Sequence, residues 1–303
     1  MTTRTERSRT GKRPAGFTML ELVLVIAIIS ILISLLLPAI QSSREIARKT
    51  QCAKNLMQIG LAVGNYHATN KVLPPGVVNP TGPISSLPSG YHWGWEARIL
   101  PFLEQANLYN QLNFLHGVYE PANDTSRTRR LSVFQCPSDA GPMLTSYAGC
   151  HHDVEAPIAA DNHGVLFLNS RVGYDDITDG PASTILAGEF RSRTQSLGWA
   201  VGTRSSLRNA GSPINAELDL FLTTKPLSNL GDQSRDLDEV KDLIDSGELG
   251  GSFSGGFSSQ HSGGSNYVMA DGSIRFLTER IRRDVYQSLG HRADGNLISS
   301  DEY

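Results

Sequence analysis

A single acidic residue, Glu21, stands in a long apolar run near the start of the chain. From residue 17 to residue 40 it is the only ionisable side chain. A charged side chain at the centre of a bilayer costs about 2.5–3.5 kcal/mol or more, so a compensating group is expected. The chemistry that this pattern indicates for Glu21 is charge pairing with a partner.

A second set of side chains that could bind a ligand or take part in a reaction lies late in the chain. His261 precedes the pair Asp271-Gly272 with nine residues between them, and Asp179 and Glu189 add carboxylates. An extended segment would place His261 roughly 25–30 Å from the turn, so a direct His261–Asp271 pair requires the chain to fold back. We interpret Asp271 as a turn former and His261 as a structural residue, with metal or ligand binding as the alternative. The one cofactor considered is a structural calcium ion near Asp179 or Asp271, because calcium prefers oxygen ligands.

No enzymatic motif accompanies these residues. The sequence contains no nucleophile elbow, phosphate-binding loop or HExxH pattern. Trp93 and Trp95 beside His92 would suit a carbohydrate-stacking platform, although such residues more often cap a core. We therefore expect a protein that is not an enzyme.

The residues around Glu21 form the first predicted element. At about 1.5 Å per residue, residues 17–40 reach roughly 36 Å, which is enough to cross a bilayer. The preceding leader holds five basic residues and one acidic residue, and positive charge favours the cytoplasmic side. The pattern predicts one transmembrane helix with its amino terminus inside the cell.

An apolar seam extends this helix beyond the membrane. Cys52, Leu56, Ile59, Val63 and Tyr66 recur at the spacing of one helix face. Residues 73–76, which include two prolines, end the pattern. One helix from residue 17 to about residue 70 is therefore expected.

The rest of the chain has the pattern of a loop-rich β domain. Short apolar runs between Gly, Pro, Asp and Asn residues predict strands at 131–135, 145–149, 164–168, 184–187 and 198–202. Residues 97–112 indicate a helix, and residues 205–250 a variable insertion or long loop. The expected fold class is α+β, with the long helix packed on a mainly antiparallel β domain.

The strongest local signal in the domain is Asp271-Gly272 between two apolar runs. A two-residue Asp-Gly loop predicts a type I′ hairpin, in which both central residues have positive φ. Thr278 is then expected to cap a short helix that ends at Gly290.

Charge excludes one class of partner. The net charge is −3, and the leader contributes +4 of it, which leaves −7 for the remainder. A chain of this charge has no basic surface to meet phosphates, so nucleic-acid binding is not expected.

Gly16, Phe17 and Glu21 resemble the processing signal of type IV prepilins. The resemblance implies that a prepilin peptidase cleaves between Gly16 and Phe17 and that the new amino terminus of Phe17 is N-methylated. It also implies that Glu21 serves assembly, and pairing with the amino group of Phe17 on a neighbouring subunit would satisfy both charges.

Further motifs resemble the prepilin-like family of unknown function numbered 1559. They lie at residues 51–60, 100–105, 136–139, 179–189 and 261–272, the last being the H-x9-DG motif. The resemblance implies an anchored protein shaped like the major pseudopilin of type II secretion. One departure is the sequence Gly-Pro-Ala-Ser-Thr after Asp179, where Gly-Thr-Ser-Asn-Thr is usual.

The chain has three cysteines, so at least one is free or pairs with another chain. All three follow the membrane run, on the side where disulfides form readily. Cys52 and Cys136 lie in family-like motifs, which favours a Cys52–Cys136 disulfide, and Cys136–Cys150 is the alternative. A metal site from Cys136, Cys150, His151 and His152 is less favoured because no CxxC pair supports it.

These inferences predict a leader at residues 1–16, a transmembrane or filament-core helix at 17–40, its continuation at 41–72, and an extracytoplasmic domain at 73–303. The expected location is the inner membrane, with a single pass. The expected function is a structural subunit of a type IV pilus, pseudopilus or related secretion assembly, whose partners are pilin-like subunits or copies of itself. The alternative is a solitary anchored protein that binds a glycan, peptide or metal.

Overall fold

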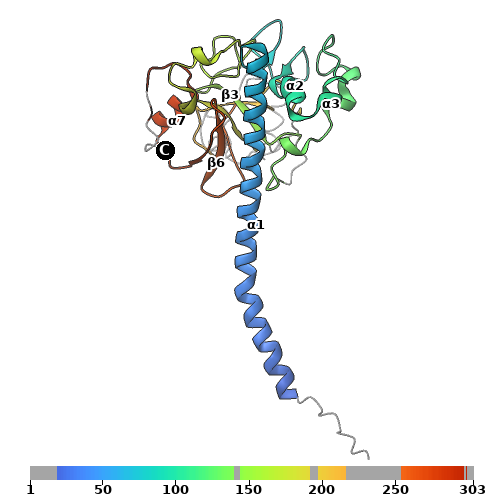
Figure 1. Ribbon diagram of the computed structural model, residues 1–303, viewed down its shortest axis with the longest axis vertical. Helices are drawn as coiled ribbons and strands as arrows, with labels where there is room; N and C mark the ends of the chain where they lie inside the picture. The colour runs from blue at the N-terminus through green and yellow to red at the C-terminus, as the bar shows by residue number, and fades with distance from the viewer. Residues whose placement is uncertain (1–18, 140–143, 192–196, 216–253, 297, 299–303) are drawn as a thin grey trace, which may run out of the picture. The chain divides into compact units, whose positions relative to one another are not determined.

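The computed structural model describes residues 19–139, 144–191, 197–215, 254–296 and 298 (Figure 1). Gly16 and Phe17 lie outside the described residues, as does most of the expected insertion at 205–250. The chain forms two units, one ending at Ile46 and the other beginning at Ala47. The expected α+β fold is confirmed, since a long helix precedes a domain of mixed strands and short helices.

Helix α1 spans Met19–Asn70, 52 residues, and includes Pro38. In the first unit its Leu, Ile and Val side chains are exposed around the whole circumference of the helix. In the second unit four residues of the predicted seam, Cys52, Leu56, Ile59 and Val63, are at most 1% exposed. The fifth, Tyr66, is partly buried against the same cluster. The helix ends where Lys71 adopts a φ of 62°, three residues before the first proline.

The main sheet has five strands in the order β5-β3-β4-β6-β7. Its strands are β3 Tyr147–His152, β4 Ile185–Glu189, β5 Leu207–Asn209, β6 Gly264–Met269 and β7 Ile274–Thr278. All neighbours are antiparallel except β3 and β5, which are parallel. A separate antiparallel pair joins β1 Val77–Val78 to β2 Trp93–Gly94.

Two hydrophobic clusters use alternate residues of the strands. In β6, Val268 belongs to the cluster that contains the buried seam of α1, whereas Tyr267 and Met269 belong to the cluster that contains α7 (Arg283–Gly290). Side chains alternate between the two faces of a strand, so the sheet separates the two clusters. Trp93 and Trp95 are fully buried in the first cluster, so they are core residues, as the favoured interpretation expected, and neither ring offers a face for carbohydrate stacking.

Several local predictions were wrong. Residues 131–135 contain a 3-10 helix (η3, Ser132–Phe134), while 164–168 and 198–202 form only isolated bridges, Val77 with Leu168 and Trp93 with Val201. Short apolar runs fit buried loops as well as strands, because both can be covered on all sides.

The predicted helix at 97–112 is broken into α2 Trp95–Ile99, the 3-10 helix η1 Leu100–Leu103 and α3 Ala106–Tyr109. The break follows Pro101, which has no N–H to donate, and Glu104, whose φ is 59°. The remaining short helices are α4 Asp124–Arg127 and the 3-10 helices η2 Pro121–Asn123, η4 Tyr174–Asp176 and η5 Pro181–Ser183.

The late hairpin is confirmed, but its turn is not type I′. The Gly272 N–H donates to Met269 O at 2.9 Å, and the Met269 N–H donates to Ser273 O at 2.8 Å. Gly272 has a φ of 87°, whereas Asp271 does not have a positive φ. A three-residue loop closed by one left-handed residue explains this pattern, and it needs only the glycine at positive φ. Thr278 does not cap α7 either, because it ends β7 and the helix begins at Arg283.

Candidate functional site

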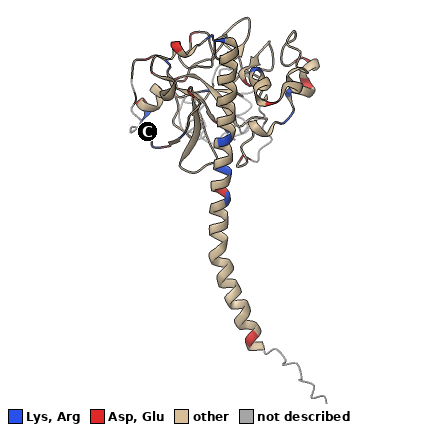
Figure 2. Cartoon of the chain, in the orientation of Figure 1, with Lys and Arg blue, Asp and Glu red and all other residues tan. Residues whose placement is uncertain are grey.

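The first part of α1 is the candidate anchor. An 18-residue window of this helix has a mean hydropathy of 3.0 and none of it is buried; among the described residues it is the one helix with the length and composition to cross a membrane. Glu21 lies in the first turn of α1 and is exposed. In Figure 2 the helix is tan from that turn to the charged residues near its middle. The helix therefore presents an apolar surface that a membrane or a set of like helices would cover.

The predicted disulfide between Cys52 and Cys136 is confirmed. It joins the buried face of α1 to the segment after η3, with 5.2 Å between the two Cα atoms. Cys150 is a free, buried thiol that donates to the carbonyl oxygens of His152 and Gly290 at 3.6 and 3.8 Å. Burial raises the pKa of this thiol, so Cys150 stays protonated and unreactive.

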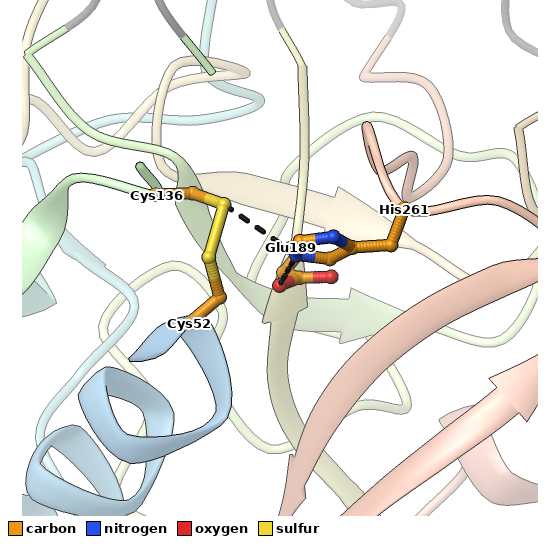
Figure 3. A group of neighbouring side chains, drawn as sticks. All are labelled: Cys52, Cys136, Glu189 and His261. Carbon is orange, nitrogen blue, oxygen red and sulfur yellow. Dashed lines mark hydrogen bonds and ion pairs between the residues drawn. A yellow bond between two sulfur atoms is a disulfide. The ribbon is translucent and has the colours of Figure 1, made fainter. Parts of the chain in front are cut away.

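His261, the first residue of the H-x9-DG motif, lies beside this disulfide (Figure 3). Its Nε2 atom is 3.6 Å from Cys136 Sγ and 3.3 Å from Glu189 Oε1. Both the His261 and the Glu189 side chains are buried. The structure thus brings together Cys52, Cys136, Glu189 and His261, four residues that come from four separate segments of the chain.

Glu189 holds this cluster through a dense set of hydrogen bonds. Its Oε2 atom accepts from Ser259 Oγ at 2.8 Å and from the Asn266 N–H at 2.9 Å, and Oε1 accepts from Asn266 Nδ2 at 3.0 Å. A buried carboxylate is costly unless it is paired in this way. The ligand atoms of the four residues lie within 4.8 Å of one another, but the disulfide removes both thiolates as metal ligands. The cluster is therefore a buried, hydrogen-bonded polar group that packs against the disulfide.

The second half of the motif lies elsewhere. Asp271 Oδ1 accepts from the Ser273 N–H at 2.8 Å and from Ser273 Oγ at 2.6 Å. The N–H groups of Ala270 and Asp271 donate to the carbonyl oxygens of Thr184 and Pro181. The turn is therefore docked on the segment that follows Asp179.

Asp179 also has backbone partners. Its two carboxylate oxygens accept from the N–H groups of Asp294 and Gly295 at 2.6 and 2.8 Å. These bonds hold the segment after α7 against the domain. The side chains of Asp179, His291 and Asp294 form one of the groups whose ligand atoms lie close enough for a shared cation.

The four-residue metal site considered from the sequence is not assembled. Cys136 forms a disulfide with Cys52, and the Cys150 thiol donates hydrogen bonds to backbone carbonyls. Burial lowers the pKa of His151 to about 3, and its Nδ1 lies 3.1 Å from Asn162 Oδ1. His152 instead faces Asp153 and His163, two residues that sequence reasoning missed. The adjacent pair His152-Asp153, shortly after the predicted strand 145–149, was the only local signal for them.

An open pocket of about 440 Å³ lies on the same domain. Its lining includes Phe167, Arg171, Asp175, Asp176 and Arg292. Two arginines and two aspartates give it mixed charge. No sequence pattern marked these residues as a group.

The long apolar helix and the domain that follows it identify the class of protein. An apolar helix with an acidic first turn, followed by an α+β domain, has the organisation of a membrane-anchored, type IV pilin-like protein, and residues 11–37 match the prokaryotic N-terminal methylation motif. Residues 41–284 match the family described as a protein of unknown function, DUF1559, and the chain belongs to that family. No curated protein and no solved structure matches the chain significantly.

Proposed function

We propose that this protein is a prepilin-like structural subunit of a type IV pilus, a pseudopilus or a related secretion assembly. The observation that carries the proposal is the methylation motif at residues 11–37 together with the exposed, apolar first part of α1. The motif implies processing by a prepilin peptidase and association with the membrane. Cleavage after Gly16 would leave Phe17 as the amino terminus, four residues before Glu21.

The role of Glu21 follows from charge. After cleavage, Phe17 carries a cationic amino group, and Glu21 carries the only carboxylate within residues 17–40. Pairing the two between neighbouring subunits would neutralise both charges in an apolar environment. The positive charge of the leader supports an amino terminus in the cytoplasm, and the domain after α1 would then lie on the outer side of the inner membrane.

The test has two parts. The intact mass of the protein extracted from membranes should begin at a methylated Phe17, and Gly16→Val should retain the leader. Crosslinking in membranes should give a ladder of oligomers for the wild type that Glu21→Leu abolishes. Ser34→Leu is the matched control, because it adds an apolar side chain to the same helix and leaves Glu21 in place.

The second candidate is a solitary anchored binding protein. The mixed-charge pocket around Asp175, Asp176 and Arg292 favours it, since a filament subunit has no need of such a pocket. In that case the mass would still begin at Phe17, but Glu21→Leu would leave the crosslinking pattern unchanged. Cleavage without Glu21-dependent oligomers would therefore reject the structural-subunit proposal.

A further inference from the structure

Two histidines and an aspartate converge at one end of strand β3. His152 Nδ1 lies 2.6 Å from Asp153 Oδ1, and His163 Nδ1 lies 2.9 Å from the same oxygen. The rings of His152 and His163 are 4.3 Å apart, and the ring of His291 lies 4.6 Å from that of His163. Three imidazoles and a carboxylate thus share one small region, away from the disulfide cluster.

The fold fixes the positions of these side chains. The register of β3 against β5 shifts between Cys150 and His152, and such a bulge redirects the side chains at the end of a strand. The loop that carries His163 is held to β3, because the Gly164 N–H donates to His151 O and the Val165 N–H donates to Cys150 O. A Cβ atom at Gly164 would lie 2.6 Å from Cys150 O, so glycine permits this close approach.

Hydrogen bonds of Asn162 and Arg292 also hold the loop that carries His163. Asn162 Oδ1 accepts from the Ala159 N–H at 2.8 Å, and Asn162 Nδ2 donates to Pro157 O at 3.0 Å. Arg292 donates through its N–H to His163 O and through its guanidinium to Asn162 O. His163 is therefore held by a rigid backbone although its own side chain is 47% exposed.

The hydrogen bonds around His152 conflict. The Val154 N–H donates to His152 Nδ1 at 3.2 Å, which requires a lone pair on that nitrogen. The same nitrogen faces Asp153 Oδ1 at 2.6 Å, where two lone pairs would repel. A proton on Nδ1 satisfies Asp153 but deprives the Val154 N–H of this acceptor. A cation bound to His152 Nδ1 and Asp153 Oδ1 would remove the repulsion between these two atoms, and like a proton it would take the lone pair that faces the Val154 N–H.

We propose that His152, Asp153 and His163 form a binding site for a divalent transition-metal ion, with zinc as the representative. Two imidazole nitrogens and one carboxylate oxygen are ligands that suit zinc, whereas calcium requires six to eight oxygens. Their ligand atoms already lie within 4.8 Å of one another. Water or His291 supplies the fourth ligand.

Binding requires only a small local movement. Ligand atoms at the Zn–N distance of about 2.0–2.1 Å in a tetrahedral site lie about 3.3 Å apart, so the two short contacts would open by roughly 0.4–0.7 Å. The exposed side chain of His163 can open its own contact with Asp153 Oδ1, and the contact between His152 and Asp153 opens through the Asp153 side chain, which is 19% exposed.

The test uses the full-length protein in detergent, without an affinity tag, stripped with a chelator and dialysed. Calorimetric titration with zinc chloride should show one saturable site per chain. His163→Gln and Asp153→Asn should each weaken that binding at least tenfold. His116→Gln, which removes an exposed imidazole on another part of the domain, should leave it unchanged.

A second measurement needs no substitution. In the wild-type protein, zinc should protect His152 and His163 from acylation by diethyl pyrocarbonate, mapped by mass spectrometry, while His116 remains reactive. Absence of a saturable site, unchanged binding in both His163→Gln and Asp153→Asn, or equal labelling of His163 with and without zinc would each overturn the proposal.

Discussion

His261 Nε2 lies 3.6 Å from Cys136 Sγ, so the histidine of the H-x9-DG motif contacts the disulfide that joins α1 to the domain. The Asp271-Gly272 half of the same motif forms the tip of the β6–β7 hairpin. The two halves therefore act at two places. One supports the disulfide, and the other docks the hairpin on the segment after Asp179.

Glu189 should be essential for stability. Glu189→Ala would remove the acceptor that His261, Ser259 and Asn266 share in a buried site, and the loss of a buried acceptor costs about 1–3 kcal/mol for a donor. Glu189→Gln keeps one acceptor oxygen and should lose less. Urea denaturation of the detergent-solubilised protein measures both, and equal stability of Glu189→Ala and the wild type would refute the prediction.

The disulfide should contribute strongly to stability. It closes a loop with a sequence separation of 84, for which chain entropy gives roughly 4–5 kcal/mol. Cys52→Ser combined with Cys136→Ser should therefore lower the urea midpoint markedly. Cys150→Ala serves as the control, since it removes the third sulfur and leaves the disulfide. Adding a reductant should then destabilise the wild type and Cys150→Ala but not the double variant.

Two glycines on α1 should respond to alanine in opposite directions. A Cβ atom at Gly60 would lie 2.6 Å from Val268 Cγ2, whereas one at Gly64 would meet only Tyr174 OH at 3.9 Å. Gly60→Ala should destabilise the domain by about 1–3 kcal/mol through overpacking. Gly64→Ala should stabilise it by about 0.5–1 kcal/mol, because alanine is the better helix former. Thermal unfolding of both variants decides the matter, and a change of the same sign in the two would contradict the packing of α1 on β6.

Glu96 should make stability fall as pH rises. Burial raises the pKa of Glu96 well above its usual value, although a hydrogen bond from Thr145 opposes the shift. The unfolded chain therefore loses this proton at a lower pH than the folded chain, and folding is penalised above the unfolded pKa of 4.5. Glu96→Gln should therefore raise the free energy of unfolding at pH 7.

The pH dependence supplies the control for this prediction. Below about pH 4 the carboxyl is protonated in both states, so the stabilities of Glu96→Gln and the wild type should converge. Denaturation curves measured at several pH values would show the difference growing upward from pH 4.5. A difference that does not change with pH would mean that the substitution acts through packing alone.

The sequence by itself determined the elements whose signals are local or periodic. A continuous apolar run marks the first part of α1, the spacing from Cys52 to Val63 marks its buried seam, and Asp271-Gly272 marks the hairpin. Resemblance of the flanking motifs also indicated the correct disulfide partner. Each of these signals depends on neighbours within a few turns of chain or on a short motif.

Tertiary structure alone decided which distant side chains meet. His261 reaches Glu189 and Cys136 because β6 pairs with β4 and the disulfide holds α1 in place, and no periodicity encodes that convergence. His163 reaches Asp153 because its loop bonds to β3 beside a bulge. The tertiary structure also decided the turn type and the strand boundaries. Hydrogen-bond partners far along the chain determine whether a short apolar run becomes a strand or a buried loop.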